Sequence, residues 1–244
     1  MKPSILIACC LLLLALSCKT INLIQTPQTN TTQQVSLGSI GSGKEFVLQK
    51  GFDNSAVPNY KAPIKLSVIT RPFTKQTYKA FIKAKALQSA DIAVTYIDSV
   101  PNKPKYLQLQ IADKVAIITA LNSEENRDVK DYLSLNTYAQ VLSSMSVVFN
   151  QKDIESINNA DAVFLIQNGI KTYAIQLYKN KVKTQTISFN DGVVFEYQTS
   201  YCCWQENNKH QIDIVDLVST FSACPNNTYR SPKRSKKNIN YYKL

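Results

Sequence analysis

Residues 162–200, AVFLIQNGIKTYAIQLYKNKVKTQTISFNDGVVFEYQTS, contain four apolar runs separated by short turn sequences. The runs cover 162–167, 170–178, 182–189 and 193–200, and they are rich in the β-branched and aromatic residues that favour strands. Asn168-Gly169, Asn180 and Asn190-Asp191-Gly192 separate them and favour tight turns. Strands joined by such short turns pair with their neighbours, so this stretch predicts an antiparallel meander.

Further strands are predicted on both sides of the meander. Residues 64–70 and 105–111 alternate between apolar and polar side chains, as a strand with one buried face does. Residues 92–97 show a similar pattern, and an apolar run at 115–121 follows a two-residue turn at 112–113. Residues 212–218 add a last strand after the meander.

Helices are predicted in three places. Residues 74–88 fit a strand as well as a helix, and their alanine and lysine content favours the helix. A helical region runs from 122 to about 149, where apolar residues recur mostly every three or four positions, and a short helix covers 153–158. The predicted fold class is therefore α+β, an antiparallel sheet meander with one main helical region in mid-chain.

The rest of the chain divides by composition. Residues 19–43 are mostly Thr, Gln, Asn, Ser and Gly, which bury too little apolar surface to fold by themselves. They predict a flexible tether over 18–43, followed by a globular domain over 44–224 and a basic, disordered tail over 225–244.

The N-terminus has the pattern of an export signal. Lys2 is followed by an apolar stretch from Ile5 to Leu16, which is too short to span a bilayer as a helix. Leu14-Ala15-Leu16-Ser17-Cys18 then resembles the signal of bacterial lipoproteins. That resemblance implies cleavage after residue 17, lipid attachment to the thiol of Cys18 and acylation of the new N-terminus.

The same resemblance implies where the protein resides. Lys19, rather than an aspartate, follows the cysteine, which in Gram-negative lipoproteins favours the outer membrane over the inner one. We therefore expect an exported cell-envelope protein that the lipid anchor holds on the membrane. Nucleic acid is a poor partner for such a protein, even though the formal net charge is +11.

Three cysteines remain after the signal and Cys18 are set aside. They are Cys202, Cys203 and Cys224, and disulfides persist in an oxidising compartment. An odd count predicts one bridge and one free thiol. We expect Cys224 to be bonded to either Cys202 or Cys203.

The C-terminal segment is strongly basic. Six basic residues and no acidic one follow Pro225. Such a run is usually a solvated, disordered end, and the alternative is a docking site for an anionic envelope polymer or an envelope protein complex. The candidate contacts for that partner are Arg230, Lys233, Arg234, Lys236 and Lys237.

The sequence contains little that indicates catalysis. His210 is the single histidine, so a Cys203–His210 pair or a zinc site must use it, but the spacing fits neither known pattern. The closely spaced carboxylates Asp213 and Asp216 are more typical of a solvated surface. We predict no catalytic residue, no metal site and no cofactor. The expected role is non-catalytic binding or assembly, and the alternative is an envelope hydrolase acting on polysaccharide or peptide.

A modification site is also predicted. Asp98-Ser99-Val100 matches a short pattern that one group of Gram-negative bacteria uses for O-glycosylation of exported proteins. Ser99 is the candidate acceptor, and it lies beside a predicted turn.

Overall fold

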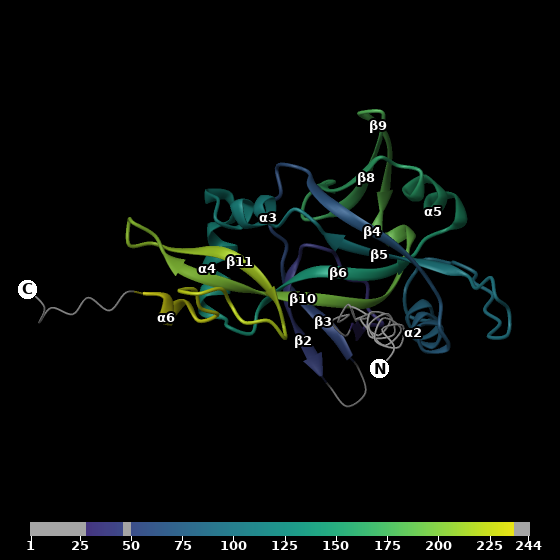
Figure 1. Ribbon diagram of the computed structural model, residues 1–244, viewed down its shortest axis with the longest axis horizontal. Helices are drawn as coiled ribbons and strands as arrows, with labels where there is room; N and C mark the ends of the chain where they lie inside the picture. The colour runs from purple at the N-terminus through teal and green to yellow at the C-terminus, as the bar shows by residue number, and fades with distance from the viewer. Residues whose placement is uncertain (1–27, 46–49, 237–244) are drawn as a thin grey trace, which may run out of the picture.

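The structure, a computed structural model, describes residues 28–45 and 50–236. In these residues eleven strands join into one antiparallel sheet, with helices packed against it (Figure 1). The strands are β1 (Thr29–Asn30), β2 (Ile40–Glu45), β3 (Lys50–Ala56), β4 (Ile64–Pro72), β5 (Lys105–Ile111), β6 (Gln140–Val148), β7 (Ala162–Gln167), β8 (Tyr173–Lys179), β9 (Val182–Ser188), β10 (Val193–Glu206) and β11 (Ile212–Ser219). The helices are α2 (Lys75–Lys85), α3 (Lys114–Leu121), α4 (Arg127–Leu135), α5 (Gln151–Asn158) and α6 (Pro232–Ser235), with 3-10 turns η1 (Glu124–Asn126) and η2 (Phe189–Asp191).

The strand order confirms an antiparallel sheet built partly as a meander. It runs β1-β10-β6-β5-β4-β7-β8-β9, and β7, β8 and β9 pair consecutively. The fourth run of the predicted meander, β10, pairs with β6 instead of β9. The long strand β10 also pairs with β1 and β11, while the β2–β3 hairpin joins the sheet through β6. β10 therefore connects the first and last described strands.

Two apolar cores lie on opposite faces of the central strands. Successive residues of a strand point to opposite faces. Leu107 of β5 and Val147 of β6 belong to the larger core, which also contains residues of α3, α4 and α5. Their neighbours Tyr106 and Val148 belong to a smaller, aromatic core beneath α2. Figure 1 shows α2 on the other side of these strands from α3.

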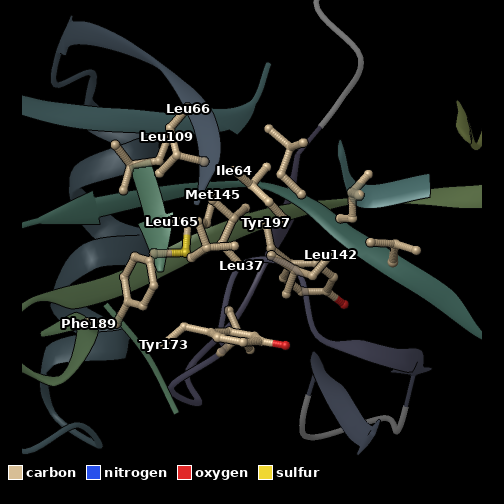
Figure 2. Packing of buried hydrophobic residues seen from close by; sticks show 14 of the residues in the cluster. Leu37, Ile64, Leu66, Leu109, Leu142, Met145, Leu165, Tyr173, Phe189 and Tyr197 are labelled. Atoms are coloured by element: carbon tan, nitrogen blue, oxygen red, sulfur yellow. The ribbon is translucent and has the colours of Figure 1, made fainter. Parts of the chain in front are cut away.

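The predicted tether is wrong for residues 28–43. Val35, Leu37 and Ile40 are at most 3% exposed and pack in the larger core, where Figure 2 shows Leu37 in one cluster with Met145 and Tyr197. Three apolar residues at this spacing are enough to fix the polar segment, whose backbone then pairs with the sheet. Residues 18–27 lie outside the described residues.

Helix α2 confirms the helical alternative for residues 74–88. Thr74 caps its start, because the Thr74 side chain accepts from the Thr77 backbone N–H and the Thr77 side chain accepts from the Thr74 N–H. Phe81 and Ala84, three positions apart, are buried against the sheet. Lys75, Lys79 and Lys83 are exposed on the rest of the helix.

Residues 92–97 are not a strand. They belong to no strand of the sheet and instead pack against α2. Ile92 is buried in the smaller core, Tyr78 Oη donates to the carbonyl of Val94 at 3.0 Å, and Tyr96 stacks on Tyr78 with ring centroids 4.9 Å apart. Alternating burial against a helix produced the strand-like pattern.

The run at 115–121 is the helix α3 and not a strand. Asp113 caps it, because Asp113 Oδ1 accepts from the Ala116 N–H at 2.9 Å. Ile117 and Leu121, four positions apart, are completely buried. A short, continuously apolar run fits both structures, and the cap was the feature that distinguished them.

The predicted helical region over 122–149 ends at residue 135. Residues 127–135 form α4, and 140–148 form the central strand β6. β6 lies between β5 and β10, so Val141, Leu142, Met145 and Val147 are buried along with residues on its other face. A strand buried on both faces does not alternate, and its apolar residues then fit a helical spacing. The helix predicted at 153–158 is confirmed as α5.

Candidate functional site

A polar cleft of about 410 Å³ opens beside the middle of β10. It lies between the N-terminal β1, the start of α3, and the end of β11 with the turn that follows. Its lining side chains are mostly amides and hydroxyls, with one lysine and a few apolar groups: Gln28, Thr29, Gln110, Lys114, Ser143, Gln198, Thr199, Ser200, Leu217, Val218, Ser219, Thr220, Phe221 and Ser222. We call this feature the polar cleft.

A β-bulge shapes one wall of the polar cleft. Gln198 of β10 pairs with Ser144 of β6, but the next residue, Thr199, pairs with Leu142, so Ser143 is an extra residue. Such a bulge turns a side chain away from the regular alternation. Ser143 Oγ accepts a hydrogen bond from Ser200 Oγ at 2.8 Å. Two hydroxyls from neighbouring strands therefore meet at this wall.

The sheet beneath the cleft carries a row of polar side chains. Gln110 of β5, Ser144 of β6 and Gln198 of β10 are direct neighbours across the three strands. Ser144 is 1% exposed, and its Oγ has no hydrogen-bond partner among the described residues. An unpaired buried hydroxyl is costly unless something else satisfies it. It lies between two amide residues that line the cleft, and the unused hydrogen-bonding capacity of this row is that of the Ser144 hydroxyl.

The cleft is close to electrically neutral. Lys114, the first residue of α3, is the one charged side chain among the lining residues. Its Nζ donates to the carbonyl of Leu217 at 2.9 Å and lies 3.6 Å from Asp216 Oδ1. Because Asp216 balances the charge of Lys114, the lining offers no strong attraction for an ion.

The outer rim of the cleft is the turn that follows β11. Phe221 lies at its tip and is 72% exposed, which is unusual for an aromatic side chain. Ser219 Oγ and Ser222 Oγ are 2.7 Å apart across the turn. The Arg230 guanidinium donates to the carbonyls of Ser219, Thr220 and Ser222 at 3.3, 2.9 and 2.7 Å. Arg230 therefore fixes the backbone that presents Phe221.

A covalent bond and a strand-like contact hold Arg230 in place. Cys203 of β10 is disulfide-bonded to Cys224, with Cα atoms 5.7 Å apart. The Trp204 and Tyr229 backbones exchange two hydrogen bonds, of 2.8 and 3.0 Å. The Arg230 guanidinium also lies 4.2 Å above the ring of Tyr201. The C-terminal segment thus returns to β10 and braces the rim of the polar cleft.

The predicted disordered tail is wrong for residues 225–236. Pro232 and Ser235 of α6 are buried, and Arg230 is engaged within the protein instead of being free for a partner. Lys233, Arg234 and Lys236 are exposed, so their role in binding an anionic partner stays a prediction. Lys237 lies outside the described residues.

The cysteines follow the predicted count, with one bridge and one free thiol. Cys224 is bonded to Cys203, and Cys202 is the free cysteine of the described residues. Burial raises the pKa of the Cys202 thiol to about 12, so Cys202 is a packed core residue and not a reactive one. The bridge also removes Cys203 as a nucleophile, and His210 Nδ1 contacts Glu206 Oε1 at 2.8 Å instead.

The two closely spaced carboxylates Asp213 and Asp216 each form an ion pair. Asp213 Oδ1 is 2.6 Å from Lys130 Nζ, and Asp216 pairs with Lys114. Burial raises the pKa of Glu196, which lies opposite Ser146 on the sheet. Within residues 28–45 and 50–236, no three His, Cys, Asp or Glu side chains come together as a metal site would require.

Two further predicted sites, Ser99 and Cys18, concern modification of the chain. Ser99 is exposed in a turn, as a glycosylation acceptor must be, and its modification stays a prediction. Cys18 lies outside the described residues. Among the helices that are described, none has the length and apolar character needed to cross a membrane.

The arrangement as a whole suits binding by hydrogen bonds. Amides donate and accept, hydroxyls rotate to do either, and an exposed ring lies at the rim. Sequence reasoning missed this site, because its residues come from five separate parts of the chain; the adjacent Ser143 and Ser144 inside an apolar run were the one local signal. Searches of known protein families, of curated proteins and of solved structures find no match to this chain.

Proposed function

We propose that the protein is an exported, lipid-anchored cell-envelope protein with a non-catalytic binding role, and that the polar cleft is its ligand site. The ligand class is a neutral, hydroxyl-rich molecule such as a segment of an envelope glycan. The observation that carries this proposal is the lining of the cleft, in which amides and hydroxyls dominate and the one lysine is balanced by Asp216.

The geometry of the cleft supports this ligand class. A glycan offers many hydroxyls that donate and accept hydrogen bonds, and Gln110, Gln198 and the serines supply both functions. The apolar face of a sugar ring also packs on an aromatic ring, and Phe221 lies exposed at the rim for such a contact. A strongly charged ligand would find no unbalanced charge in the lining.

Two features support the location. The Cys203–Cys224 bridge is typical of proteins in oxidising compartments. The resemblance of residues 14–18 to lipoprotein signals supports an anchor at Cys18, and Lys19 favours the outer membrane. Partners in the envelope, either a polymer or a protein complex, follow from that location.

The anchor predicts a change of cell fraction. Replacing Cys18 with Ala should remove the lipid and with it stable membrane attachment. Stable anchoring takes more than one acyl chain, because a single chain gives only marginal binding to a membrane. Cell fractionation with immunoblotting measures the shift, and Cys202→Ala is the matched control. A Cys18→Ala protein that stays in the membrane fraction with its signal cleaved would refute the anchor.

The ligand class predicts binding that depends on the cleft. An array of neutral oligosaccharides should give binders whose affinity falls about fivefold with Phe221→Ala, since a ring contact contributes roughly 1 kcal/mol. Calorimetric titration measures the change. Leu135→Ala is the control, because Leu135 is a similarly exposed apolar residue, 85% exposed, at the end of α4.

Two other outcomes would contradict the proposal. Absence of any neutral binder would remove the ligand class, and equal losses from Phe221→Ala and Leu135→Ala would remove the cleft as the site. Release of new reducing ends from a bound oligosaccharide would instead favour the envelope hydrolase.

A further inference from the structure

A second hollow, of about 610 Å³, lies on the sheet at the start of β7 and the end of β8. Its walls are mainly apolar and come from Pro63, Ala162, Phe164 and Tyr178. The Phe164 and Tyr178 rings meet edge to face, with centroids 5.4 Å apart. We call it the aromatic recess.

The strand register places the aromatic recess on the face opposite the larger core. Val163 and Leu165 point into that core, so Phe164 between them points the other way. Tyr178 lies directly opposite Ala162 across β7 and β8, on the same face as Phe164. Both rings are only partly buried, so the recess remains accessible from outside.

Three lysines surround the aromatic recess. Lys65 of β4 is the direct neighbour of Phe164, and Lys183 of β9 is the direct neighbour of Tyr178. Lys181, in the turn between β8 and β9, lines the recess itself. All three are exposed, and in the described part of the chain no carboxylate forms an ion pair with any of them.

One acidic residue belongs to the recess, and its position is fixed. Asp161 Oδ2 accepts from the Asn180 backbone N–H at 2.6 Å and so holds the turn that carries Lys181. Three cations against one carboxylate leave the rim positive. An apolar floor with a positive rim fits a ligand that is apolar at one end and anionic at the other.

We propose that the aromatic recess binds an anionic lipid at a membrane surface. An acyl chain packs against Phe164 and Tyr178, and the lipid phosphate lies near Lys181 and Lys183. A peptide fits less well, because the apolar walls offer few partners for its backbone groups. This inference goes beyond the proposed function: the recess is separate from the polar cleft, and it gives the folded domain a membrane contact of its own.

The test measures lysine protection on the full chain carrying Cys18→Ser. The protein is acetylated with an amine-reactive reagent in the presence of vesicles of phosphatidylcholine, either alone or with one third phosphatidylglycerol, and each lysine is followed by mass spectrometry. Lys65, Lys181 and Lys183 should react at least about threefold more slowly with the anionic vesicles. Lys209, in the exposed turn between β10 and β11, should not change. Because protection is read at each residue, attachment through the N-terminal apolar stretch does not affect the result.

A pair of charge-matched variants tests the site. In Lys181→Gln/Lys183→Gln, protection of Lys65 should need about tenfold more anionic lipid, because each basic residue near an anionic surface contributes severalfold to binding. Lys79→Gln/Lys83→Gln, on the exposed face of α2, changes the net charge equally and should leave Lys65 protection unchanged.

Three results would overturn the inference. They are equal acetylation of the recess lysines with both kinds of vesicle, equal losses in the two double variants, and equal protection of Lys65 by a soluble polyglutamate peptide. The first two would show that the recess does not bind lipid specifically, and the third would show an acidic peptide site. None of them depends on the polar cleft.

Discussion

Replacing Cys203 and Cys224 with serine should lower the free energy of unfolding by about 3 kcal/mol, since the bridge closes a loop of 21 residues and restricts the unfolded chain. Urea denaturation measures the loss. Trp204 is the single tryptophan, is 2% exposed and follows Cys203 directly, so its fluorescence reports unfolding at this point of the sheet.

Reduction provides the matched control for this prediction. A reductant should bring the wild-type protein to the stability of the double variant and should leave the double variant unchanged. A wild-type protein whose stability does not respond to reductant would contradict the prediction. The double variant should also bind the cleft ligand more weakly, because the bridge holds the segment from which Arg230 fixes the rim.

Replacing Phe73 with Ala should lower the free energy of unfolding by about 3–5 kcal/mol, which is the usual cost of removing a buried aromatic side chain. Phe73 is 1% exposed, and its ring contacts those of Tyr78, Phe81, Tyr106 and Phe195 at centroid distances of 5.0 to 5.9 Å. No other ring in the described part of the chain makes four such contacts, and Tyr78, Phe81 and Phe195 make three each. Chemical denaturation followed by near-UV circular dichroism measures the change.

Two control variants should each lose less stability than Phe73→Ala. Phe73→Leu retains most of the buried volume and should cost clearly less than Phe73→Ala. Phe221→Ala removes the same side chain from an exposed position and should leave stability within about 0.5 kcal/mol. If Phe73→Ala were as mild as Phe221→Ala, the aromatic packing beneath α2 would not contribute as the structure indicates.

The sequence predicted the parts of the fold that depend on local signals. Asn168-Gly169 and the alternating strand at 105–111 indicated an antiparallel sheet, and the structure contains both. Local sequence patterns gave the wrong secondary structure where tertiary contacts determine which residues are buried. Residues 92–97 alternate because they cover α2, and residues 140–148 do not alternate because both of their faces are buried.

The polar cleft could not be predicted from the sequence. Gln28, Gln110, Ser143 and Gln198 are ordinary polar residues in four separate segments, and only the strand order brings them together. The order of residues 225–236 could not be predicted for a related reason. A run of basic residues has the same composition whether it is solvated or, like Arg230, hydrogen-bonded to a turn that precedes it in the chain.

The position of β10 also determines when the protein can fold. β1, near the beginning of the described chain, and Tyr229, near its end, both pair with this one strand. A chain that emerges from its N-terminus first must therefore wait for β10 before β1 and β6 meet the strand they pair with. Folds that depend on such distant pairings form slowly, and the unpaired edge of β6 stays open to other chains meanwhile. The late arrival of β10 thus leaves the newly made chain in need of protection from aggregation until β10 can pair with β6.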